Sequence, residues 1–131
     1  MKTLTTLAVL TALLISSACA GLTARQEILI PSMEIAWVNV SRDCERGIQL
    51  ALDTEDITVV QAAGLRSEII AMDSALQARD ILKVADVNWH RLHQLALVAI
   101  EERDIGYNVK KILKLRLTKF HEAYVTLVKS L

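Results

Sequence analysis

The sequence has little of what breaks helices or ties a fold together covalently. Its 131 residues include one proline, four glycines, two cysteines, two tryptophans, two tyrosines and one phenylalanine. Alanine, leucine, isoleucine, lysine, arginine and glutamate are abundant instead. This composition favours helix throughout the chain.

Motifs that carry catalytic chemistry are also missing. The sequence contains no G-x-S-x-G, no glycine loop that could cradle a phosphate, and no plausible Cys/His pair. Its carboxylates cluster where helix ends are expected, and capping explains them there. We therefore predict that the protein is not an enzyme.

The first residues have the organisation of an export signal. Met1 and Lys2 give a short positive start, and the run from Leu4 to Ile15 carries no charge. That run is too short to span a bilayer, which needs about 20 apolar residues in a helix. Small residues typical of a cleavage site follow it. We predict that residues 1–18 are a signal peptide and that the protein is exported.

The stretch Ile15-Ser16-Ser17-Ala18-Cys19 resembles the lipobox of bacterial lipoproteins, which phages also encode. The resemblance implies that diacylglycerol is attached to the Cys19 thiol and that the chain is cut just before this residue. The mature protein would then be anchored to a membrane and face the periplasm. Ala20, rather than Asp, at the next position implies the outer membrane. The alternative is ordinary cleavage after Ala20, which would leave the protein unanchored.

Either cleavage leaves Cys44 as the one free thiol of the mature chain, which excludes a fold built on an internal disulfide. Cys44 follows Trp37 by seven residues and Val40 by four, on an apolar helical stripe. We expect a buried, inert thiol. An intermolecular disulfide is the alternative.

We expect residues 19–30 to form a lipidated N-terminus and tether, and residues 31–131 to form a single domain. Apolar residues recur through this domain at steps of three and four. The predicted helices span residues of about 31–52, 57–79, 81–104 and 108–131. Val60, Leu82, Val109 and Ile112 are among the residues that we place on their apolar faces.

Short polar stretches separate these helices. Pro31 suits an early position in the first helix, and Asp53 to Asp56 are expected to cap the second. Asp80 is the preferred cap of the third helix, although the pattern Ser74 to Gln77 would start it earlier. Gly64 suggests a close approach by another helix.

Amphipathic helices joined by short turns predict an all-α, antiparallel up-and-down bundle, with four helices as the first choice. Three helices with one long bent helix are the alternative. The charges divide unevenly between the helices. Residues 107–131 carry six basic side chains and one acidic, whereas residues 19–106 carry eight basic and fourteen acidic.

The basic last helix is therefore a candidate for contact with a partner or an anionic membrane, near Tyr107 or Trp89. Its candidate residues are Lys110, Lys111, Lys114, Arg116 and Lys119. The alternative is pairing within the molecule, with Glu101, Glu102 and Asp104. Nucleic acid is not expected as a partner, because export separates the two and the helix lacks an aromatic and arginine pattern.

His90 and His93 form an H-x-x-H pair, which is a weak metal candidate because no third and fourth ligand accompany it. Met33 and His121 are similar in arrangement to the axial ligands of exported four-helix haem proteins. The C-x-x-C-H motif of covalent haem is missing. We expect no metal and no cofactor.

Together these features predict a non-enzymatic envelope lipoprotein, held at a membrane by Cys19. It would act as an adaptor, scaffold or exclusion factor through a helical face, with a protein partner in the envelope. The alternative is a soluble periplasmic bundle that carries haem, a metal or a small apolar ligand.

Overall fold

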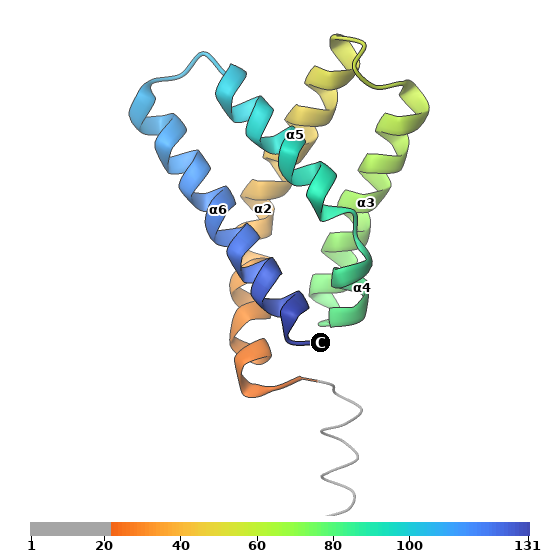
Figure 1. The fold of residues 1–131 in the computed structure, drawn as a ribbon, viewed down its shortest axis with the longest axis vertical. Helices are drawn as coiled ribbons and strands as arrows, with labels where there is room; N and C mark the ends of the chain where they lie inside the picture. Colours follow the sequence, from red (N-terminus) through yellow and green to blue (C-terminus); the bar gives the residue numbers. More distant parts are fainter. Residues whose placement is uncertain (1–21) are drawn as a thin grey trace, which may run out of the picture.

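The computed structural model describes residues 22–131, which form five helices and no strand. The helices, labelled as in Figure 1, are α2 (Ala24–Asp53), α3 (Val59–Gln77), α4 (Ile81–Asp86), α5 (Trp89–Glu102) and α6 (Tyr107–Lys129). The all-α class is confirmed. The count of four helices is wrong, because the third predicted helix is divided into α4 and α5. The predicted signal peptide and Cys19 lie outside the described residues.

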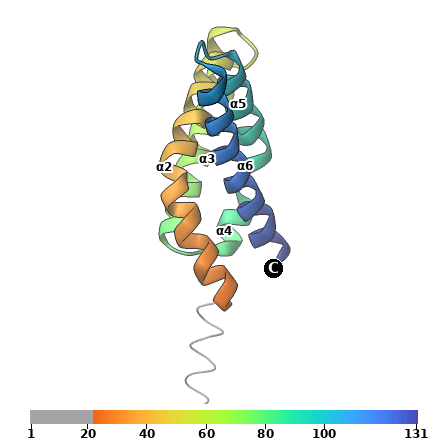
Figure 2. The ribbon, with the colours of Figure 1, turned by 90° about the vertical axis from the view of Figure 1, so that its left-hand side faces the viewer.

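Helix α2 is the centre of the fold and contacts α3, α5 and α6. Figure 1 shows α3 and α6 on either side of α2, with α5 crossing in front of it. In the view turned by 90° the assembly is narrow, so that α2 and α6 both have a side toward solvent (Figure 2). None of the helices within residues 22–131 combines the length and the apolarity needed to cross a bilayer.

Helix α2 begins at Ala24, so the prediction of a tether up to residue 30 is wrong for its last seven residues. The reason is a capping box. The Thr23 hydroxyl accepts from the Gln26 backbone N–H, and the Gln26 side chain accepts from the Thr23 N–H. Gln26 is itself buried, and its amide donates to the Ser130 hydroxyl at the end of α6 over 2.6 Å. Pro31 lies inside the helix rather than at its start.

Helix α3 is also capped by a threonine, Thr58, whose hydroxyl accepts from the Gln61 backbone N–H. The expected cap within residues 53–56 is wrong, because these residues form the turn that ends α2. Glu55 stands there in the left-handed region with a φ of 61°. Val60 points away from the core and is 80% exposed, contrary to its predicted place on the apolar face.

The predicted helix over residues 81–104 breaks at Val87 and Asn88. Asp80 caps α4 as expected, by accepting from the Lys83 backbone N–H. Val87 has an extended backbone and a buried side chain. Asn88 then caps the start of α5, because its side chain accepts from the backbone N–H of Arg91. The break turns the chain without losing burial, because Val87 still reaches the core.

The core forms where α2, α5 and α6 meet. Trp37 from α2, Trp89 from α5 and Phe120 from α6 are all buried. The ring centroid of Phe120 lies 5.3 Å from that of Trp37 and 4.8 Å from that of Trp89. Edge and tilted arrangements of this kind add to the energy of burial. Most of the predicted α2 stripe is confirmed as core: Met33, Trp37, Val40, Cys44 and Ile48 are buried.

The glycine that allows close approach is Gly47 rather than Gly64. A Cβ at Gly47 would overlap the backbone carbonyl of Leu95. The backbone of α5 can therefore lie directly against α2 because residue 47 has no side chain. Gly64 has open space around its missing Cβ, and the prediction for it is wrong. Three further residues expected on apolar faces are exposed: Leu82, Val109 and Ile112.

Candidate functional site

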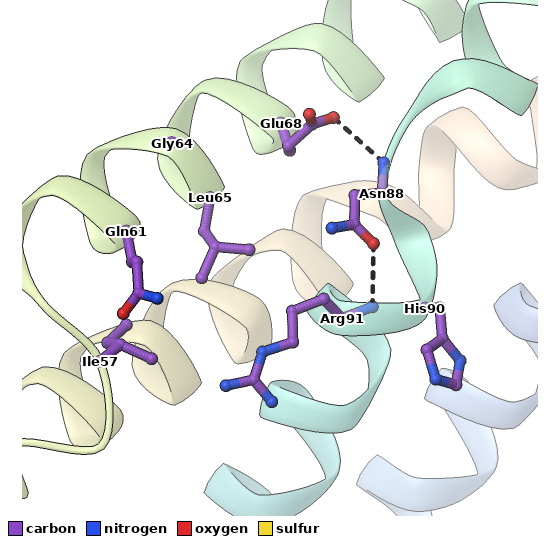
Figure 3. A pocket seen from close by; sticks show the side chains of 8 residues that line it. All are labelled: Ile57, Gln61, Gly64, Leu65, Glu68, Asn88, His90 and Arg91. Carbon is purple, nitrogen blue, oxygen red and sulfur yellow. Dashed lines mark hydrogen bonds between the residues drawn. The ribbon is translucent and has the colours of Figure 1, made fainter.

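An open groove of about 570 Å³ lies between α3 and the start of α5. Ile57, Gln61, Gly64, Leu65 and Glu68 line one side of it, and Asn88, His90 and Arg91 line the other (Figure 3). Ile57 and Leu65 are buried and form an apolar floor, whereas Gln61, Gly64 and His90 are exposed. Its size falls within the range usual for small-ligand pockets.

The break between α4 and α5 builds one wall of this groove. Glu68 on α3 accepts the backbone N–H of Asn88 over 3.1 Å, which ties α3 to the first residue before α5. The carboxylate thereby satisfies a backbone donor at a helix start, where a negative charge is favourable. Glu68 thus has a structural role in the wall of the groove.

Arg91 supplies the cationic group of the groove. Figure 3 shows its side chain extending toward Ile57 and Gln61, while His90 points the other way. Arg91 also lines a second hollow of about 270 Å³ between α2 and α5. A guanidinium beside an apolar floor can bind a carboxylate attached to an apolar group. No sequence pattern marks Arg91, because only the fold places it opposite α3.

The two histidines of the H-x-x-H pair do not act together. His93 instead stacks on His121 of α6, with parallel rings whose centroids are 4.3 Å apart. The Trp89 indole N–H donates to His121 Nδ1 over 3.0 Å. Burial lowers the pKa of His93, and the charges of His121 and His90 lower it further. Within residues 22–131 no three His, Cys, Asp or Glu side chains come close enough to hold a metal ion.

The haem-like arrangement of Met33 and His121 does not fit the geometry between α2 and α6. The rings of Trp37 and Phe120 occupy the space between these helices. Met33 is buried in the core, and His121 uses Nδ1 to accept from Trp89. A haem there would have to displace the largest side chains of the core.

The basic residues of α6 are divided among different surroundings. The Lys110 ammonium donates to the Glu101 carbonyl over 2.7 Å, and Lys114 pairs with the Glu101 carboxylate. Pairing within the molecule therefore accounts for these two residues. Lys111 is exposed. Arg116 and Lys119 line a small hollow beside α2. Tyr107 is exposed, whereas Trp89 is buried and unavailable for contact.

Cys44 is buried, as predicted, and its thiol is free. Burial, together with the charge of the neighbouring Asp43 carboxylate, raises the pKa of this thiol to about 12. Asp43 is buried too, and burial raises its pKa, while Arg116, Arg46 and Arg103 oppose that rise. A buried thiol that stays uncharged is chemically inert.

Comparison of the chain with known proteins finds no matching family model, no matching curated protein and no matching solved structure. The candidate site is therefore interpreted from its own residues.

Proposed function

We propose that the protein is a membrane-anchored envelope lipoprotein, held through Cys19, whose helical domain is a non-enzymatic adaptor or scaffold. The groove between α3 and α5 is the observation that supports this proposal most strongly. It is open, has the apolar floor of Ile57 and Leu65, and carries one cationic side chain, Arg91. A partner segment with an apolar side chain and a nearby carboxylate fits these features.

The groove also lacks a group of side chains typical of catalysis. Glu68 is engaged by the Asn88 backbone, and His90 points away from Arg91. The side-chain oxygens of Gln61 and Asn88 accept from backbone N–H groups at the starts of α3 and α5, which leaves their NH2 groups as donors to the carbonyls of a partner. These features favour binding over chemistry.

The anchor is tested by intact mass and detergent partitioning of the mature protein, compared with Cys19→Ala. The expected mature chain starts at Cys19, carries acyl mass and enters the detergent phase, because several acyl chains give durable anchoring. A wild-type chain that begins at Gly21 and stays in the aqueous phase would show that the anchor is wrong.

The partner surface is tested by site-specific photo-crosslinking in the intact envelope. A photoreactive residue at Gln61, in the groove, is compared with one at Gln94, which is exposed on α5 outside it. We expect a discrete crosslinked product from position 61 alone, weakened by Arg91→Ala. The same products from both positions, unchanged by Arg91→Ala, would contradict a specific groove contact.

A soluble periplasmic carrier is the second candidate, and the volume of the same groove favours it. About 570 Å³ suits a small apolar ligand with an acidic group. A copurifying molecule in the native mass spectrum, lost in Arg91→Ala, would support the carrier. Because a soluble carrier has no lipid anchor, the copurifying molecule would have to be bound to protein that carries no acyl mass.

A further inference from the structure

The outward side of the first half of α2 is apolar and has no protein partner within residues 22–131. Ile28, Ile35 and Val38 are 73%, 77% and 56% exposed. Ile28 and Ile35 are seven residues apart, which is close to two helical turns, so they share one line along the helix. We call Ile28, Ile35 and Val38 the outer stripe of α2.

The outer stripe lies opposite the core. Ile35 is two residues from both Met33 and Trp37, and two residues correspond to about 200° around a helix. Met33 and Trp37 are buried against the rest of the fold. The outer stripe is therefore directed away from the core that α5 and α6 help to form.

Charges along α2 are segregated in the same way. Arg25 and Arg42 are exposed and flank the outer stripe, three residues before Ile28 and seven after Ile35. The acidic residues fall on another line, Glu27, Glu34 and Glu45, and Glu45 pairs with Arg66 of α3 over 2.7 Å. Ile28, Ile35 and Arg42 thus lie on one line of α2, seven residues apart. Glu34 precedes Val38 by four residues and Glu45 follows it by seven, so carboxylates border the outer stripe at Val38, and Glu45 is directed toward α3, where it pairs with Arg66.

Helix α6 adds cations at the edge of the same side. Arg116 and Lys119 face α2 across a hollow of about 180 Å³ that Ser32 and Ala36 also line. Glu122 follows the α2-facing Phe120 by two residues and so projects from the far side of α6. The side chains of Arg116 and Lys119 are both exposed, and the charge of Arg116 also opposes the rise in the pKa of the buried Asp43.

We propose that the outer stripe of α2, with Arg25, Arg42 and Lys119, lies on an anionic membrane surface. This proposal rests on the proposed function, because Ala24 is only five residues from Cys19. A chain of that length spans at most about 18 Å. An anchor at Cys19 therefore keeps the start of α2 within about 18 Å of the lipid. Apolar side chains flanked by cations bind such a surface, with the apolar groups entering the acyl boundary.

A second copy of the chain is the competing occupant. A two-fold interface on this face would place the outer stripe of one copy on that of another. Arg25 and Arg42 would then lie against a face that carries the same cations, with carboxylates only at its Val38 edge. A lipid surface with phosphate groups complements the same charges, which favours membrane over self-association.

The test uses the mature protein reconstituted in vesicles of phosphatidylethanolamine and phosphatidylglycerol. A fluorophore is attached at Ile35→Cys or, as the control, at Gln94→Cys on α5; buried Cys44 stays unlabelled. We expect the label at position 35 to be quenched by spin-labelled lipid and shielded from aqueous iodide at least about fivefold relative to position 94. Equal access of iodide to both positions would overturn the proposal.

Two variants separate the contributions of the face. Ile28→Asn with Ile35→Asn should remove the lipid contact, reported by a second label at Ser32→Cys, while the helical circular dichroism stays unchanged. Arg42→Gln should weaken the contact only in vesicles with phosphatidylglycerol, and Arg79→Gln, an exposed arginine beyond α3, should have no effect. A label at position 35 that stays shielded in detergent, with crosslinks between copies, would establish self-association instead.

The intact mass of the same sample distinguishes failure of this proposal from failure of the proposed function. If the chain carries acyl mass but position 35 is accessible to iodide, the anchor is supported and the proposed contact of the outer stripe with the membrane is wrong. A chain without acyl mass would remove the anchor. The labelled variants added to preformed vesicles would then decide the membrane face alone, by the same quenching.

Discussion

The two sides of α5 are packed in opposite ways. Toward α2, the backbone of Leu95 lies against Gly47, and Trp89 is buried against Trp37. Toward α3, the same helix is separated by a groove of about 570 Å³, and the Glu68 carboxylate bridges to the Asn88 backbone there. One helix thus combines a tight interface with an open one.

The difference shows how a small helical domain can keep a surface open for binding. The aromatic residues and the glycine contact concentrate the stabilising burial on the α2, α5 and α6 side. Helix α3 relies more on its own capping box and on its contacts with α2. Residues that line the groove can therefore be substituted, or a ligand bound there, with little effect on the packing of α5 against α2.

The largest expected effect tests the tight side through Trp89→Ala. Trp89 is 1% exposed and contacts the rings of Trp37 and Phe120. Removing a buried aromatic side chain costs about 3–5 kcal/mol, through lost burial and the cavity left behind. We expect a loss near the middle of that range in urea denaturation. Val60→Ala, on the exposed side of α3, is the control and should change the free energy of unfolding by less than about 0.5 kcal/mol.

The next effect compares the two sides directly through glycine substitutions. Gly47→Ala should destabilise by about 3 kcal/mol, because the added Cβ meets the Leu95 backbone, which cannot rotate away. Gly64→Ala should stabilise by about 0.5–1 kcal/mol, because nothing lies near the new Cβ and alanine favours helix. Thermal or urea denaturation measures both. Equal effects of the two substitutions would abolish the contrast between the interfaces.

The smallest effect is a pH dependence at His93. The ordinary pKa of histidine is near 6.5, and the pKa of folded His93 is lower, so the unfolded chain binds the proton first. The free energy of unfolding should therefore fall as the pH falls below about 6.5, until the lower folded pKa is passed. His93→Gln should flatten this slope, and His90→Gln should flatten it much less, because His90 makes the smallest of the contributions that lower the pKa of His93. An unchanged slope in His93→Gln would show that protonation of His93 does not contribute to the pH dependence of the free energy of unfolding.

Local patterns in the sequence predicted much of the fold, and each miss has a physical reason. Asp80 as a cap and the α2 stripe through Ile48 follow from short-range rules. The early start of α2 departs from the prediction because the Thr23–Gln26 capping box starts the helix seven residues before Pro31. The break at Asn88 was missed because Ala85, Trp89 and Leu92 keep helical spacing across it.

The candidate site was less predictable. The basic residues of α6 were recognised as a set, but the fold assigns Lys110 and Lys114 to Glu101 and leaves Lys119 beside α2. Arg91 and Glu68 gave no signal, since they are far apart in sequence and ordinary in type. The outer stripe of α2 lies opposite the predicted buried face, but only the placed neighbours show that no other helix within residues 22–131 covers it.

The sequence by itself determined the helical class and the buried face of α2, because helical periodicity and capping act over a few residues. It also carries the basis for the proposed lipid anchor, which is a local motif. Only the tertiary structure decided which glycine meets a helix, which histidines stack and where a groove stays open. These features depend on the angle at which α5 crosses α2, and that angle is set by side chains from distant parts of the chain that pack together at one point.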